Sequence, residues 1–275
     1  YNKVKANKLH AIGTAGKLYY GKENRIKFEP DGDARPILRF PHRKEDNLEG
    51  AIVLYEGPYR NQEGQTPHNL YLVCHDPYGQ NQSADSSSLG AAYVIKRINN
   101  ISKPDDLIVA SYVGRPHTQD EYNKNLFMLA DYYNAKIGFE NDRGAVIQYA
   151  RQHRKLHRLQ EEFEMLDKKE LRSRNVKRNF GMHTTEARKR QGELYIRDWL
   201  NAVRSDDGDT ITLNLHKIYD LALLQELIKF NHRGNFDRVM ALMIGMYHTR
   251  ELYNAEVKEI IEDNSSNEWF DKNYY

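Results

Sequence analysis

The sequence predicts an α/β protein in which helices flank a mixed β-sheet. Three short apolar runs follow one another at 69–76, 89–98 and 107–114, each rich in β-branched and aromatic residues and bounded by Asp, Gly, Pro or Ser. A helical segment separates them from a fourth strand-like run at 135–140, and helical patterns prevail after Gly144. Three sequential strands can pair as antiparallel neighbours, and a fourth can join them through a helical crossover. We therefore expect a single mixed sheet.

Turn and capping signals predict the remaining elements. Residues 1–66 carry many Gly and Pro residues between short apolar runs, which is typical of short strands and loops. Thr118 is a predicted helix N-cap, with Glu121 in the third position of a capping box. The later helices, the second of them capped by Thr184 or Thr185, are predicted at 144–168, 184–204, 217–230 and 235–252.

Length and composition exclude several classes of protein. The 275 residues suffice for one large domain or two small ones without disulfide or metal staples. No apolar run approaches the roughly 20 residues that cross a bilayer, and the N-terminus lacks the apolar region of a signal peptide. Cys74 is the only cysteine, which fits a reducing compartment. We expect neither membrane insertion nor secretion, and the start at Tyr1 suggests a piece of a longer protein.

The formal net charge of +2 conceals a gradient along the chain. Residues 151–190 hold 13 Lys and Arg against 6 Asp and Glu, whereas 251–275 hold 2 Lys against 7 Asp and Glu. A basic stretch of this density attracts polyanions, and an acidic tail repels them. For 151–170 a solvated helix face is the alternative, because its charges alternate in sign at spacings that allow pairing along a helix.

Three carboxylates stand out by their positions. Asp76 ends the first strong strand, Glu140 ends the fourth, and Asp237 lies in the first turn of an apolar helix whose inward face it shares with Met240 and Ile244. If the first and fourth strands are parallel neighbours, Asp76 and Glu140 meet at the strand ends, where ligands of open α/β sheets bind. Carboxylates gathered in this way are typical of a metal site.

Each of these acids also has a structural interpretation. Asp76 precedes a proline and can start a turn, Glu140 can cap the next helix, and Asp237 can interact with a helix dipole. Two other patterns are weak. The segment 13–17 contains two Gly and a Lys but lacks the spacing and the hydroxyl of a phosphate loop. His153 and His157 are spaced like half of a zinc site but lack its glutamate, which favours a solvated or DNA-facing surface.

Five segments, in this order, resemble the C-terminal nuclease domain of the large terminase subunit of tailed bacteriophages and related viruses: 71–95, 107–116, 132–147, 180–200 and 230–246. The resemblance implies a ribonuclease-H-like fold and an endonuclease that cuts concatemeric double-stranded viral DNA during packaging. It implies that Asp76, Glu140 and Asp237 form the catalytic, metal-binding triad for two Mg²⁺ or Mn²⁺ ions. It also matches Asp85 to a further acid of some members.

The physical case agrees with this resemblance. Two divalent ions activate water and neutralise the leaving oxygen in phosphodiester hydrolysis, and hard cations prefer carboxylate ligands. Basic side chains then hold the DNA backbone by charge. The candidates for this role are Arg143, Arg151, Arg154, Lys177, Arg178, Arg188 and Lys189.

Domain organisation and partners follow from the same resemblance. Residues 65–252 are the expected nuclease domain, 1–64 a flank that leads toward a missing ATPase domain, and 253–275 an acidic tail. The implied partners are DNA, the terminase ATPase domain, the portal and the small terminase subunit, in the cytoplasm of an infected bacterium and without a membrane. The alternatives are a non-catalytic DNA-binding or docking domain of the same motor and another ribonuclease-H-like enzyme.

Overall fold

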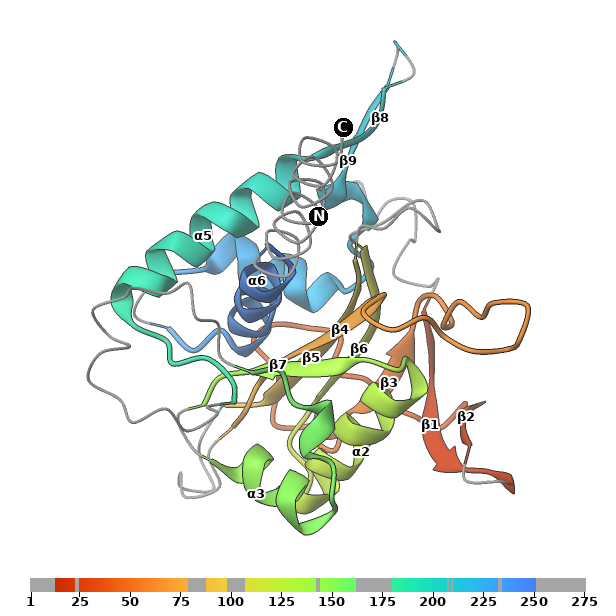
Figure 1. Ribbon diagram of the computed structural model, residues 1–275. Helices are drawn as coiled ribbons and strands as arrows, with labels where there is room; N and C mark the ends of the chain where they lie inside the picture. The colour runs from red at the N-terminus through yellow and green to blue at the C-terminus, as the bar shows by residue number, and fades with distance from the viewer. Residues whose placement is uncertain are drawn as a thin grey trace, which may run out of the picture.

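Figure 1 shows the computed structural model of the chain. The structure describes residues 13–22, 25–78, 88–97, 107–141, 144–161, 180–206, 208, 210–231 and 234–250. Within these ranges, seven strands form one sheet in the order β2-β1-β3-β6-β5-β4-β7. The strands are β1 (Thr14–Tyr20), β2 (Ile26–Pro30), β3 (Ala51–Leu54), β4 (Tyr71–Asp76), β5 (Gly90–Lys96), β6 (Leu107–Gly114) and β7 (Lys136–Phe139).

The centre of the sheet has the predicted topology. β4, β5 and β6 pair as antiparallel neighbours, and β7 pairs with β4 in parallel, with His75 opposite Phe139. The helix α2 (Gln119–Tyr132) makes the crossover between β6 and β7. In the ribonuclease-H-like arrangement, three sequential strands are antiparallel neighbours, and the fourth pairs in parallel with the first, on the side away from the second. Here β4, β5 and β6 are the three antiparallel strands and β7 is the fourth. The predicted fold class, a mixed sheet flanked by helices, is confirmed.

Both faces of the sheet are covered, as Figure 1 shows, by α2 and α3 (Ala145–Gln152) on one side and by α5 (Glu186–Asn201) and α6 (Leu221–Lys229) on the other. Side chains alternate between the two cores along β5, where Ala92 and Val94 join the α2 side and Tyr93 and Ile95 join the other. A sheet buried on both faces explains why its central strands read as continuous apolar runs.

Cys74 lies in the second of these cores and is fully buried. Its Sγ donates to the carbonyl of Tyr93 at 3.4 Å, and burial raises the pKa of the thiol to about 12. A β-carbon at Gly245 would overlap this sulfur, so the helix that carries Gly245 packs directly on β4.

The helix starts agree with the capping signals. Thr118 accepts from the Glu121 backbone N–H at 3.2 Å, and the Glu121 carboxylate accepts in return from the Thr118 N–H, also at 3.2 Å. Thr185 caps α5, and Asp220 caps α6 through the N–H groups of Ala222 and Leu223. The last predicted helix occupies 237–250 of the described residues.

The helix predicted at 144–168 is wrong over 153–161, and residues 162–168 lie outside the described part of the chain. α3 ends at Gln152 because Arg154 adopts a left-handed backbone with φ of 56° and the Lys155 N–H turns back to the Ala150 carbonyl at 2.7 Å. After a short 3₁₀ helix, η3 (Leu156–Arg158), the chain runs along β7, where Leu159 bridges Ile137. Backbone pairing with an existing sheet edge thus replaces two turns of helix.

Two further features were not predicted. The hairpin of β8 (Val203–Asp206) and β9 (Ile211–Leu213) extends away from the body of the fold. In addition, β3 pairs with β6, so the strands β1, β2 and β3 from residues 14–54 extend the same sheet. None of the helices in the described part of the chain has the length and apolar character needed to cross a membrane.

Candidate active site

Asp76 and Glu140 occupy matching positions at the ends of two parallel neighbours. The last register pair of β4 and β7 joins His75 to Phe139, and the Glu140 N–H donates to the His75 carbonyl at 3.3 Å. The next residue of each strand is therefore an acid at the same edge of the sheet. Asp76 is buried and Glu140 is half-buried.

Asp237 reaches this edge from the start of helix 237–250. One carboxylate oxygen accepts from the Leu89 N–H at 2.8 Å and from the Asn235 side chain at 3.2 Å, and the other accepts from the Ser88 hydroxyl at 3.1 Å. Ser88 and Leu89 directly precede β5. The carboxylate is therefore fixed between the helix and the central sheet.

The three acids predicted from the sequence line one cavity of about 290 Å³. Its described lining also contains Ser88, Asn231 and Asn235. Four carboxylates and one amine face this space, namely those of Asp76, Glu140, Glu186, Asp237 and Lys189. Negative charge thus predominates, and a cation would relieve the repulsion.

Glu186 lines the cavity but was not among the residues predicted from the sequence. It begins α5 directly after the Thr185 cap, a position where acids are common for helix stability alone, so its sequence signal is weak. Asp85, the fourth acid predicted from the resemblance, lies outside the described residues.

Burial dominates the electrostatics of Asp237. It raises the pKa of this carboxyl to about 6, although the hydrogen bonds from Leu89 and Ser88 act in the opposite direction. A carboxyl with a strongly perturbed pKa that lines a cavity is a candidate for a functional site.

The donor chemistry suits a hard divalent cation, because carboxylate and amide oxygens surround the cavity. Across the described ranges, however, no three His, Cys, Asp or Glu side chains are arranged to hold one ion as they stand. The oxygens of Asp237 already accept hydrogen bonds from three neighbours. The residues fit a divalent metal by the chemistry of their oxygen donors and by the cavity they share, but not by the positions that their side chains take in this structure.

Arg115 supports the segment that holds Asp237. Its guanidinium donates to the Ser88 carbonyl at 2.9 Å and lies 5.3 Å from the centre of the Tyr78 ring. Gln119 donates to the Tyr78 carbonyl at 2.7 Å from the first turn of α2. The chain on both sides of the segment 79–87 is thereby tied to the end of β6 and the start of α2.

Six of the seven predicted DNA-contacting residues divide into three groups. Arg143, Lys177 and Arg178 lie outside the described residues. Lys189 lines the carboxylate cavity and pairs with Glu186 at 3.6 Å. Arg151 and Arg154 are exposed around the C-terminal end of α3.

Arg188 was predicted to contact DNA, but the structure places it in the interior. Its side chain is buried, and its guanidinium donates to the His183 carbonyl at 2.5 Å. Its backbone carbonyl accepts from the Tyr247 hydroxyl at 2.8 Å. These contacts fix the start of α5 against helix 237–250, so Arg188 is a packing residue instead of a surface contact for DNA.

Comparisons with known proteins give similarity at the level of structure. No protein-family model and no curated protein sequence matches the chain. Three solved structures of the large terminase nuclease from thermophilic phage G20c are similar to it, one without a stated metal, one with bound zinc and one with bound magnesium. The first is 15% identical to this chain, with a TM-score of 0.43, and the match covers 76% of this chain and 91% of the other. The zinc form is 14% identical, with a TM-score of 0.43 and the same two coverages. The magnesium form is 14% identical to this chain, with a TM-score of 0.44 over 77% and 92%.

Proposed function

We propose that the chain is a divalent-metal-dependent endonuclease that cuts double-stranded DNA, acting as the nuclease domain of a viral DNA-packaging terminase. The observation that carries the proposal is the cavity shared by Asp76, Glu140 and Asp237 at the ends of β4 and β7. The fold and the order of resembling segments support the same assignment. The terminase ATPase domain, the portal and the small subunit are the corresponding partners.

In this proposal Asp76, Glu140 and Asp237 hold two Mg²⁺ or Mn²⁺ ions. When bound, such ions acidify the attacking water and neutralise the leaving oxygen. The chain itself orients the ligands: Ser88 and Leu89 fix the Asp237 carboxylate, and the strand ends fix the other two acids. Lys189 supplies positive charge that attracts the DNA phosphate toward the cavity.

A plasmid assay tests the proposal. Supercoiled plasmid is incubated with the protein in magnesium, manganese, calcium or EDTA, and nicked and linear forms are measured. We expect cleavage with magnesium or manganese and little with calcium, a larger ion with irregular coordination. Asp76→Asn, Glu140→Gln and Asp237→Asn should each abolish cleavage while the protein stays folded.

The matched control is Asp33→Asn, because the Asp33 side chain is fully exposed. It should cut at the wild-type rate. Wild-type rates in all three cavity variants would overturn the assignment of the acids. DNA binding without cleavage under any metal condition would instead establish the non-catalytic docking domain.

A further inference from the structure

A second cavity, of about 540 Å³, lies where β4 and β7 begin. Thr66, Pro67 and His68, which precede β4, and Asn134, which precedes β7, line it together with Tyr20 from the end of β1. A strand of six residues spans about 20 Å, so β4 separates this space from the carboxylates at its other end. We call it the basic cavity.

The basic cavity is opposite in charge to the carboxylate cavity. Its described lining includes Arg25, Arg60 and Arg158 and one acid, Asp131. The Asp131 carboxylate is already paired with Lys155 at 2.6 Å and with Arg158 at 2.7 Å. The net field in this space is therefore positive, and anions are attracted to it.

Two of the arginines face solvent. Arg25 and Arg60 are exposed and line the cavity, and the Arg60 guanidinium donates to the Gly64 carbonyl at 3.1 Å. They come from different segments, before β2 and before β4. Guanidinium groups on separate segments of one cavity can each bind a phosphate of a chain-like polyanion.

Tyrosines accompany these charges. Tyr20 is 46% exposed, and the Lys155 ammonium donates to its hydroxyl at 3.1 Å. Tyr132 lines the same space, and its ring packs edge-on against Tyr133. An aromatic face beside arginines is the combination with which proteins bind single-stranded nucleic acid, because bases stack on the ring while the phosphates meet the cations.

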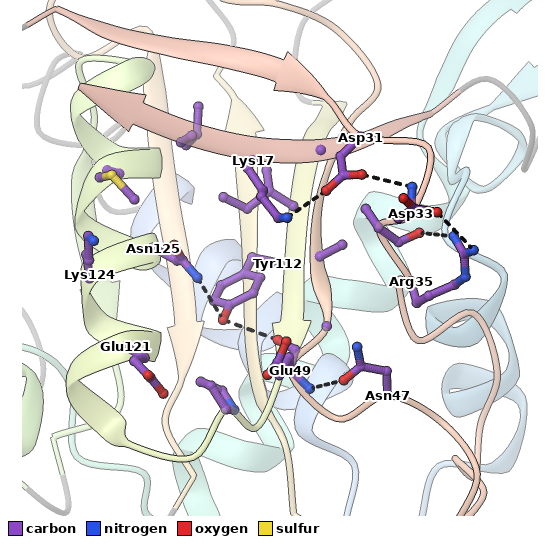
Figure 2. Close-up of a pocket in the computed structure, with 18 residues that line it drawn as sticks. Lys17, Asp31, Asp33, Arg35, Asn47, Glu49, Tyr112, Glu121, Lys124 and Asn125 are labelled. Atoms are coloured by element: carbon purple, nitrogen blue, oxygen red, sulfur yellow. Dashed lines mark hydrogen bonds and ion pairs between the residues drawn. The ribbon is translucent and has the colours of Figure 1, made fainter. Parts of the chain in front are cut away.

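A third cavity lacks this combination of positive charge and exposed aromatic rings. It measures about 410 Å³ and lies between α2 and β1. Figure 2 shows that Lys17 points toward Asp31, which pairs with it at 2.7 Å, and that Asn125 points toward the Tyr112 hydroxyl. Its described charges are three basic and four acidic groups, so it offers no net attraction to a polyanion.

We propose that the basic cavity binds an unpaired DNA strand, with phosphates on Arg25 and Arg60 and a base stacked on Tyr20. This binding goes beyond the proposed cleavage, because it takes place at the opposite edge of the sheet and requires no metal. The site can hold a strand that extends beyond the cut. In EDTA the carboxylate cavity has no metal to offset its negative charge and repels phosphates. Under this condition the binding of single strands depends on the basic cavity.

Fluorescence anisotropy with a labelled oligothymidylate of 15 nucleotides, in EDTA, tests the proposal. The double variant Arg25→Gln/Arg60→Gln should bind at least about tenfold more weakly and reduce the slope of log K against log salt by up to about 1.4, since each phosphate contact on a single strand contributes about 0.7. Tyr20→Ala should weaken binding at least about fivefold through lost stacking, while Tyr20→Phe keeps the ring and the affinity.

Arg35→Gln is the matched control, since Arg35 is an exposed arginine of the third cavity. It should bind as the wild type does, and thermal melts check that every variant is folded. Unchanged affinity in the double variant would overturn the proposal, as would equal displacement of the probe by polyglutamate, which would indicate an acidic peptide partner. Asp76→Asn should bind normally, so a failure of cleavage and a failure of this site are distinguishable.

Discussion

Asp237→Asn should stabilise the metal-free protein at neutral pH, although it removes a residue of the proposed site. The Asp237 carboxyl is buried, and burial raises its pKa from an ordinary value of 3.8 to about 6. Between these two pH values the folded protein keeps a proton that the unfolded chain has lost. Folding stability therefore falls as the pH rises through this window, and above it the ionised carboxylate destabilises the fold.

The magnitude follows from the size of the shift. The difference between 3.8 and about 6 corresponds to about 3 kcal/mol, at 1.36 kcal/mol for each pH unit. The asparagine amide has no charge to bury, but it keeps one acceptor oxygen for the three donors Leu89, Ser88 and Asn235. Each lost hydrogen bond costs about 1 kcal/mol. We expect a net gain of about 1–2 kcal/mol at pH 8 and no gain at pH 4.

Thermal denaturation of wild type and variant in EDTA, from pH 4 to pH 8, measures this difference. The curves should converge at the acid end and separate above pH 6, where the variant melts a few degrees higher, at about 2–4 °C per kcal/mol. Excess magnesium should then raise the Tm of the wild type and not that of the variant. A variant that is equally destabilised at both ends of the range would refute the reasoning and show that the hydrogen bonds dominate.

Three further substitutions test the surroundings of the site. Thr118→Ala removes the cap of α2 and should lower the free energy of unfolding in urea by about 1 kcal/mol, whereas Thr118→Ser should not. Gly138→Ala places a β-carbon on the His248 ring and should destabilise the protein by about 1–3 kcal/mol in the same assay; wild-type stability would mean that the ring can shift. Arg115→Ala frees the Ser88 carbonyl and should slow plasmid nicking about tenfold at an almost unchanged Tm, and an unchanged nicking rate would exclude a positioning role.

The central sheet was predictable because its signals are local. The runs that became β4, β5 and β6 are apolar on both faces, and Thr118 with Glu121 specifies a helix start within four residues. Asp76 and Glu140 could be placed together because each ends such a strand.

The errors arose where long-range pairing decides the structure. Helical periodicity continues past Gln152, but the edge of β7 offers backbone partners to the segment around Leu159, and this tertiary contact prevails over propensity. The burial of Arg188 has the same origin, since a basic run does not reveal which of its members faces a neighbouring helix. The pairing of β3 with β6 joins segments more than fifty residues apart and leaves no local trace.

The single cysteine can report how often the core behind the carboxylate cavity opens. Cys74 lies two residues before Asp76 in β4, and its thiol is fully buried against Gly245 of helix 237–250, with its pKa raised to about 12. Such a thiol reacts with alkylating agents only after a local opening of the core, and separation of this helix from the sheet is one such opening. The rate of thiol labelling therefore measures how often the core around Cys74 opens. Because the same helix carries Asp237, a ligand that joins Asp237 to the strand ends will slow the modification of Cys74 without any added probe.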